Sequence, residues 1–358
     1  MSGGIFPSSK NFKACQGGIR FAEVGFAPCG TSVCIPSAKC ACTAAAASVA
    51  ASLKLDDAAA AAYAGVEVDV EEFGAKADGK TECSAAFNAA LRNVSSRGGG
   101  IVHARAKAGV YIVKPILLQN HTALQVAAGA FLNATHDCPG QDFPTLMLPR
   151  PPQCGGPLNT STGPPCGTVL FAANAHNFSV RGGGGLDGGG LVFDTIGKPH
   201  ALAPLMQFWM SSDAIVEDLR LFNSANVHIA PVFSQRMEFR RLYLYSDFAG
   251  AHHKNTDGFN PSSSSDMSLT DTFIHNGDDC IAVKSGKQPS AWTCDIPSEN
   301  ILIKNVTCAG SHGLTIGSEV AGGIRNVTFL NVRIHGTLLT PRSTACSPRR
   351  SSPCSCPC

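Results

Sequence analysis

The chain has 358 residues, enough for one large domain or two ordinary ones. Its formal net charge of +2 is too small to indicate nucleic-acid binding, and it gives little long-range attraction toward an acidic polymer. No stretch is long and apolar enough to cross a membrane as a helix. The 37 glycines, together with only 15% charged residues, favour a soluble all-β protein with many tight turns.

Cysteines and glycosylation sequons point to a secretory route. The chain has 16 cysteines, and such content is typical of oxidising compartments. Seven Asn-X-Ser/Thr sequons occur where chance gives roughly two or three; they lie at Asn93, Asn120, Asn133, Asn159, Asn177, Asn305 and Asn326. We therefore expect an extracellular, disulfide-bonded glycoprotein. Two observations oppose this: residues 1–30 lack a continuous apolar segment after a basic start, and Asn-Val-Thr also suits a turn at a strand edge.

Residues 1–64 form a cysteine- and alanine-rich extension, which we expect to be poorly ordered, with some helix in its alanine-rich part. Its cysteines lack partner histidines and regular Cys-X2-Cys pairs, so we predict no metal site there. The clustered cysteines are Cys15, Cys29, Cys34, Cys40 and Cys42.

The next segment predicts a strand, a turn and one helix. Residues 66–73 alternate apolar and acidic side chains and predict a strand, and residues 78–81 predict a turn. Residues 84–94 carry apolar side chains at helical spacing, and the glycines at 98–100 end this helix.

From residue 101, short β-prone runs recur roughly every 20–40 residues, a period that favours a solenoid over a sandwich. Residues 137–167 interrupt them with a proline-rich loop, which we expect to be tied by a disulfide. The glycine-rich residues 182–190 predict a tight turn. The β-prone runs are residues 110–113, 123–126, 177–180, 214–219, 237–242, 267–272, 300–306 and 326–332.

Three short motifs carry carboxylates and an imidazole. They are residues 255–258 (Asn-Thr-Asp-Gly), 277–280 (Gly-Asp-Asp-Cys) and 311–313 (Ser-His-Gly). Asp257 and Asp278 are 21 residues apart, about one coil of a solenoid. On successive coils, about 4.7–4.9 Å apart, their side chains would project from one face. A single such motif more often caps a turn, but three in step favour the paired carboxylates of glycoside hydrolysis.

In this order and spacing, Asn-Thr-Asp, Asp-Asp-Cys and a His-Gly step shortly before Ile316-Gly317-Ser318 resemble the family-28 glycoside hydrolases, the polygalacturonases and their relatives. The resemblance to this family begins at residues 73–81 (Phe-Gly-Ala-Lys-Ala-Asp-Gly-Lys-Thr) and continues to about Thr337. The resemblance implies a right-handed parallel β-helix over residues 65–337 with an N-terminal capping helix. It also implies inverting hydrolysis of a pectin-like plant or algal polysaccharide, without a cofactor.

The same resemblance implies the catalytic roles. Asp278 would be the general acid, Asp257 and Asp279 would share the general base, and His312 would tune or position the acid. Crowding of three carboxylates should raise the pKa of at least one of them.

Further residues are expected around the acids. Asn255 would orient Asp257, and Gly258 and Gly313 would let the sugar approach closely. Basic side chains beside the motifs are candidates for binding a substrate carboxylate: Lys284, His252, His253 and Lys254.

Cys280 is expected to be structural. We predict that it forms a disulfide with Cys294 around the insert between the second and third motifs.

After residue 337 the chain departs from the family pattern. The basic motif Arg-Ile-Lys is missing, and residues 338–358 are an aberrant Cys/Ser/Pro/Arg-rich tail, as in an altered or truncated end. Weak or no activity of this form is therefore expected.

Two rival functions stay open: a truncated, non-catalytic polysaccharide-binding homologue, favoured by the missing basic motif, and a β-helical pectate lyase. We expect a monomer without nucleic-acid or membrane partners. Which pectic polymer is bound, and whether cleavage is endo or exo, stays undecided.

Overall fold

The computed structural model describes residues 65–105, 109–135, 151–154, 168–190, 203–246, 255–287 and 294–336. It also describes the backbone of three short strands, β1 (Arg20–Phe26), β9 (Met147–Leu148) and β10 (Leu158–Asn159). The predictions for the rest of residues 1–64, for His252, His253 and Lys254, and for the tail at 338–358 lie outside the described residues. No described helix is long and apolar enough to cross a membrane.

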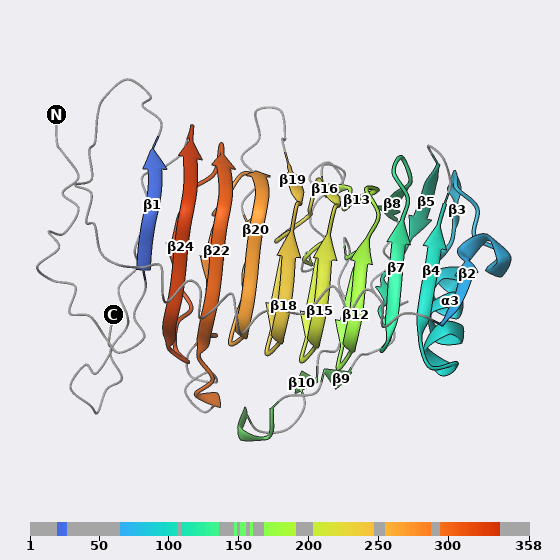
Figure 1. Ribbon diagram of the computed structural model, residues 1–358, viewed down its shortest axis with the longest axis horizontal. Coiled ribbons are helices and arrows are strands. Elements are labelled where there is room, and N and C mark those ends of the chain that lie inside the picture. Colours follow the sequence, from blue (N-terminus) through green and yellow to red (C-terminus); the bar gives the residue numbers. More distant parts are fainter. Residues whose placement is uncertain are drawn as a thin grey trace, which may run out of the picture.

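Parallel strands of the first face run side by side along the whole molecule (Figure 1). Each strand pairs in parallel with the strand of the next coil. The strands are β2 (Val66–Asp69), β4 (Gly100–Ala104), β7 (Thr122–Val126), β12 (His176–Arg181), β15 (Ser212–Glu217) and β18 (Gln235–Arg240), followed by the first halves of β20 (Ser265–His275), β22 (Ser298–Ala309) and β24 (Ile324–His335).

A second face lies behind the first and is continuous with it, because β20, β22 and β24 turn a corner and contribute to both. Asp271, Asn305 and Asn331 occupy this corner with left-handed φ values of 51°, 54° and 50°. Aspartate and asparagine tolerate that conformation. The other strands of this face are β3 (Asp78–Glu82), β5 (Val110–Val113), β8 (Phe131–Ala134), β13 (Gly185–Asp187), β16 (Arg220–Phe222) and β19 (Tyr243–Tyr245).

A third, narrower face completes each coil. Isolated bridges at Phe259 and Ser262 link β17 to β21. Its strands are β6 (Ile116–Leu117), β11 (Leu170–Ala173), β14 (Met206–Trp209), β17 (Ile229–Val232), β21 (Ile281–Val283) and β23 (Leu314–Ile316). Three parallel faces wound around one apolar core form a right-handed parallel β-helix, which confirms the predicted fold class.

The predicted helix is confirmed and closes one end of the solenoid. Helix α3 (Ser84–Ser96) extends the predicted range by two residues and buries Phe87, Leu91 and Val94 against the first coils. Gly98 follows the helix with φ +95°, which explains why glycine ends it.

Two local predictions near this helix were wrong. The predicted strand at 66–73 stops at Asp69, whose side chain caps the 3-10 helix η2 (Val70–Phe73). The predicted turn at 78–81 belongs to β3, although the Asp78 carboxylate accepts turn-like hydrogen bonds from the backbone of Lys80 and Thr81.

At the opposite end, β1 pairs in parallel with β24 (Figure 1). This strand was not predicted from the sequence; residues 1–64 were expected to be poorly ordered. The pairing covers the backbone edge of β24, which would otherwise expose unpaired amide and carbonyl groups.

The disulfide prediction was wrong in its partner. Cys280 is bonded to Cys308 on β22, with 5.8 Å between their Cα atoms. Both side chains are buried on neighbouring coils, so the pairing follows from stacking rather than from sequence proximity. Cys294 is bonded instead to Cys154, the last residue of the 3-10 helix η3 (Pro152–Cys154), within the predicted loop at 137–167.

Candidate active site

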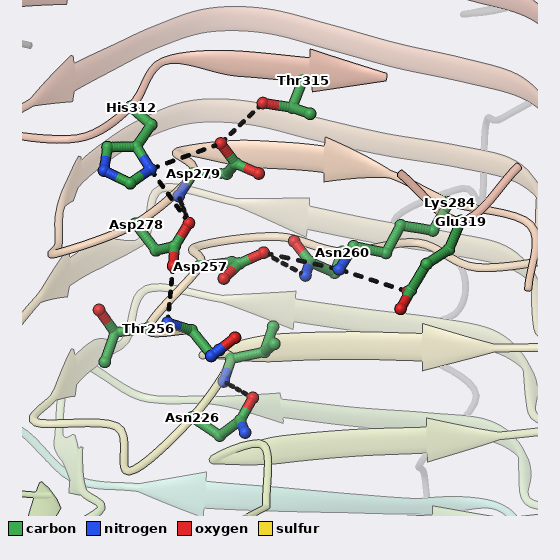
Figure 2. Close-up of polar contacts among 12 residues, drawn as sticks. Asn226, Thr256, Asp257, Asn260, Asp278, Asp279, Lys284, His312, Thr315 and Glu319 are labelled. Atoms are coloured by element: carbon green, nitrogen blue, oxygen red, sulfur yellow. Dashed lines mark hydrogen bonds and ion pairs between the residues drawn. The ribbon is translucent and has the colours of Figure 1, made fainter. Parts of the chain in front are cut away.

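The three predicted motifs occupy equivalent positions on successive coils. Asp257 precedes the Phe259–Ser262 segment of the third face, Asp278 and Asp279 lie between β20 and β21, and His312 lies between β22 and β23. Backbone hydrogen bonds fix the stacking: Gly258 N donates to Asp279 O (3.0 Å), and His312 N donates to Asp278 O (2.8 Å). The solenoid therefore brings all four predicted catalytic residues together (Figure 2).

The imidazole of His312 lies against two carboxylates. Its Nδ1 is 3.2 Å from Asp278 Oδ1 and 4.0 Å from Asp279 Oδ1. Asp278 also accepts hydrogen bonds from the backbone N–H groups of Asn255 (2.7 Å) and Asp279 (2.9 Å). The side chains of His312 and Asp278 are 28% and 22% exposed, so a ligand can reach them.

Asp257 is the most deeply buried carboxylate of the cluster, with 5% of its surface exposed. Asn260 Nδ2 donates a hydrogen bond to its Oδ2 (2.7 Å), and Lys284 Nζ lies 3.9 Å from the same oxygen. Burial, with smaller contributions from Asp278 and Asp279, raises the pKa of Asp257 to about 6.

The Asp279 carboxyl also has a raised pKa, again mainly because of burial. Thr315 Oγ donates to its Oδ1 (2.7 Å) and, together with His312, opposes the shift. The sequence predicted a raised pKa from crowding, whereas for both Asp257 and Asp279 desolvation is the larger cause.

A buried histidine supports the backbone of Asp257. His228 is completely buried, and its Nδ1 lies 3.2 Å from the Asp257 carbonyl oxygen, while its Nε2 lies 3.0 Å from Ser246 Oγ. Burial lowers the pKa of His228 to about 4, so the ring is neutral at ordinary pH. A neutral ring can donate to the carbonyl from Nδ1 and accept from the serine hydroxyl at Nε2.

The described residues predicted to bind substrate contact other parts of the protein than expected. Lys284 lies at the cluster but faces Asp257 and Glu319. The Asn255 contact with the cluster is through its backbone N–H, which binds Asp278 rather than Asp257. His253 and Lys254 lie outside the described residues.

A close contact between coils explains Gly258, and a left-handed backbone conformation explains Gly313. A Cβ at Gly258 would lie 2.5 Å from the Cys280 carbonyl oxygen and 2.8 Å from Ile274 Cγ2, so the next coil excludes it. Gly313 has φ +91°, and a Cβ there would meet only Ile334 at 3.8 Å. Coil stacking and chain conformation thus explain the two glycines without a bound sugar.

The sequence-based interpretation missed several supporting residues. Asn260 binds Asp257 within one turn, whereas Thr315 binds Asp279 and Glu319 binds Lys284 from the next coil. Asn276 is 2% exposed, and its Nδ2 donates to the carbonyls of Thr256 (2.9 Å) and Asp279 (2.8 Å), tying two acid-bearing turns together. For Asn260 and Asn276, a polar residue two or three positions from a motif acid was the available signal; Thr315 and Glu319 carried no such signal.

One side of the cluster also has the spacing of a cation site. Asp278, Asp279 and His312 each offer one ligand atom, and these atoms lie within 4.8 Å of one another. Carboxylate groups commonly show such spacing without binding an ion, so this geometry alone assigns no metal.

The fold and the cluster define the class: a parallel β-helical protein with three carboxylates and a histidine gathered from successive coils. The family model of the glycosyl hydrolases family 28 matches residues 158–345, just over half of the chain, and the chain belongs to this family.

Relatives and solved structures agree with this family. The chain is 29% identical over 265 residues to a probable polygalacturonase of Vitis vinifera, covering 72% of the chain and 52% of that protein. It is 27% identical to polygalacturonase-2 of Solanum lycopersicum, covering 75% and 54% respectively. The chain thus spans about half the length of these curated relatives.

An exopolygalacturonase from Thermotoga maritima superposes with a TM-score of 0.64 and 26% identity, covering 76% of this chain and 67% of that one. A family-28 exopolygalacturonase from Yersinia enterocolitica superposes with a TM-score of 0.63 at 19% identity, covering 77% and 55%, which supports the fold alone.

Proposed function

We propose that this protein hydrolyses α-glycosidic bonds of a pectin-like polysaccharide with inversion at the anomeric carbon. The observation that carries this proposal is the cluster of Asp257, Asp278, Asp279 and His312 on successive coils. Inverting hydrolysis requires one protonated carboxyl at the leaving oxygen and one carboxylate that activates water.

Asp278 suits the role of general acid. It is more exposed than Asp257, and the His312 imidazole lies against its Oδ1, where it can share or restore a proton. In the reaction, the Asp278 proton moves to the glycosidic oxygen as the bond from that oxygen to the anomeric carbon breaks.

Asp257 and Asp279 suit the role of general base. Their raised pKa values indicate that each binds a proton more readily than an ordinary aspartate. A water held between them would lose one proton to a carboxylate while its oxygen bonds to the anomeric carbon. The products are a reducing end with inverted configuration and a free hydroxyl on the leaving sugar.

The substrate class rests on family membership and on the names of the relatives, several of which are polygalacturonases. Two disulfides in the described part of the chain support an oxidising, extracellular setting such as a plant cell wall. We propose that the protein acts there as a monomer without a cofactor.

The experiment is incubation of the purified 358-residue chain with polygalacturonate, with and without a chelator. Hydrolysis, which we expect to be weak because this form lacks the Arg-Ile-Lys motif, should release reducing sugars with an inverted anomer, detected by proton NMR, without any ultraviolet-absorbing unsaturated product. A chelator should leave the rate unchanged. Unsaturated product that depends on calcium would move the protein to the lyases, and binding without cleavage would favour the non-catalytic homologue.

A further inference from the structure

Lys284 lies between two carboxylates at the edge of the cluster (Figure 2). Its Nζ is 3.9 Å from Asp257 Oδ2 and 3.5 Å from Glu319 Oε2. Lys284 follows β21 directly, and its backbone N–H donates to the Pro261 carbonyl (2.9 Å), so a coil-to-coil contact fixes where the side chain starts. The side chain is 23% exposed, which leaves its charge only partly hydrated.

Glu319 lies between two lysines. It accepts from Lys287 Nζ at 2.8 Å in addition to its contact with Lys284. These two cations and the Lys287 hydrogen bond lower the pKa of the Glu319 carboxyl despite its partial burial, so Glu319 stays ionised. An ionised Glu319 gives Lys284 a permanent anionic partner and fixes its ammonium beside Asp257.

Deepening the proposed function, we propose that Lys284 is a positioning residue for the reaction: it holds Asp257 in the carboxylate form and is held there by Glu319, rather than binding a substrate carboxylate. This revises the sequence-based expectation for Lys284. Both negative groups that face its ammonium belong to the protein, so a third anion would compete with contacts already present.

The charges around Asp257 explain why such a cation is needed. Burial, Asp278 and Asp279 all favour the protonated form of Asp257, whereas Lys284 and the Asn260 hydrogen bond favour the ionised form. His228 contacts the backbone carbonyl of Asp257 and not its carboxylate, and its ring is neutral. Among these groups Lys284 is the one positive charge, so its removal should raise the pKa of Asp257.

The central test compares Lys284→Met with Lys287→Met. Lys287 contacts the same Glu319 but has a 77% exposed side chain, so it is a matched control for loss of one lysine from this group. A base must be ionised to act, so kcat/KM falls as the pH drops through its pKa. In Lys284→Met this fall should move upward by about one pH unit, whereas Lys287→Met should keep the parent profile and Lys284→Arg should restore it.

A substrate-binding role gives a different result. If Lys284 binds the substrate carboxylate, Lys284→Met raises KM at every pH while the pH at which kcat/KM falls stays where it was. That result would overturn the proposal.

A second readout needs no activity. Titration of chains labelled with 13C at the aspartate carboxyl, assigned with Asp257→Asn, reports the Asp257 pKa directly by NMR. A higher pKa in Lys284→Met, with no change in Lys287→Met, supports the proposal even if the protein cleaves no pectic polymer. An unchanged Asp257 pKa in a folded Lys284→Met protein overturns it, whatever the enzyme assay shows.

Discussion

At the residue scale, each carboxylate of the cluster has a distinct set of neighbours. Asp278 contacts an imidazole and two backbone N–H groups, Asp279 a threonine hydroxyl, and Asp257 an amide and an ammonium. Different neighbours give chemically identical side chains different proton affinities, which lets one serve as acid while others serve as base.

Replacing Asp278 with asparagine tests the general acid. Asparagine keeps the size of the side chain but cannot donate a proton to the leaving oxygen, so kcat should fall by about 10²–10⁴-fold. Asp278 is partly exposed, so the melting temperature should change little. Asp271→Asn is a matched control, because Asp271 lies in an asparagine-lined corner away from the cluster. Full activity of Asp278→Asn on every polymer that the parent cleaves would contradict the assignment.

Asp257→Asn tests the cost of burying this carboxylate. The folded-state pKa of about 6 lies above the ordinary value of 3.8, so between these values the folded protein binds more protons than the unfolded chain. The contribution of Asp257 to stability is therefore fully present below about pH 4 and is lost as the pH rises through about 6.

An uncharged asparagine does not suffer this loss. The free energy of unfolding of Asp257→Asn should therefore exceed that of the parent by about 1–3 kcal/mol at pH 7. The two proteins should be equally stable near pH 4, and the variant should be inactive. Denaturant unfolding at both pH values is the measurement. A variant less stable than the parent at pH 7 would show that Lys284 and Asn260 stabilise the charged form of Asp257 by more than burial destabilises it.

At the element scale, stacked side chains hold the turns in register. Asn305 Nδ2 donates to Asp271 Oδ1 (2.8 Å), and Asn331 Nδ2 donates to Asn305 Oδ1 (2.9 Å) along the corner between the first two faces. These side-chain hydrogen bonds link the same corner on three successive coils. This ladder holds the corners of β20, β22 and β24 in register.

Three of the sequon asparagines also have a left-handed backbone and a side chain that bonds to a neighbouring coil. Asn177, Asn305 and Asn326 have left-handed φ values of 52°, 54° and 50°, and the side-chain nitrogen of each contacts a neighbouring coil. The turn interpretation of Asn-X-Ser/Thr therefore accounts for these three positions without attached sugar. Glycosylation of the chain stays a prediction.

A buried serine stack is the strongest candidate for a turn-stabilising element. The hydroxyls of Ser211, Ser234, Ser264 and Ser298 each accept from a backbone N–H of the preceding coil. Ser264→Ala should leave the Ser234 N–H buried without its acceptor and cost about 1–3 kcal/mol of unfolding free energy.

The neighbouring Ser265→Ala is the matched control for Ser264→Ala. The Ser265 hydroxyl donates to the Asp266 carboxylate near the surface and not to another coil, so its loss should change stability by less than about 0.5 kcal/mol. Denaturant unfolding of both variants gives the comparison. Equal stability of the two would show that water replaces the serine hydroxyl.

At the scale of the whole molecule, the two ends of the solenoid are closed by unlike elements. Helix α3 covers the first coils, and β1 covers the edge of β24 (Figure 1). An uncovered strand edge is a template for pairing with other chains. A solenoid needs such coverage because each coil contacts only its neighbours.

Deleting residues 1–26 should expose the β24 edge and promote association, whereas deleting residues 1–19 keeps β1 and should not. Light scattering of the two proteins at equal concentration is the measurement, with far-ultraviolet circular dichroism to show that both are folded. The same scattering from both deletions would mean that β1 does not protect this edge in solution.

The sequence alone determined the helix at 84–94, the repeating strands and the four side chains at the centre of the proposed site. These follow from local rules: helical spacing ends at glycine, turns use asparagine, aspartate and glycine, and a motif repeated after one coil returns to the same face. Family resemblance added the handedness and the proposed chemistry.

Only the tertiary structure decided which side chains from different coils touch. Loops of unequal length separate the coils, so sequence distance does not show that Cys280 meets Cys308 or that Lys284 lies beside Asp257 and Glu319. The strand β1 pairs with β24 across most of the chain for the same reason. Burial is also a property of the assembled coils, and it is burial that raises the pKa values of Asp257 and Asp279.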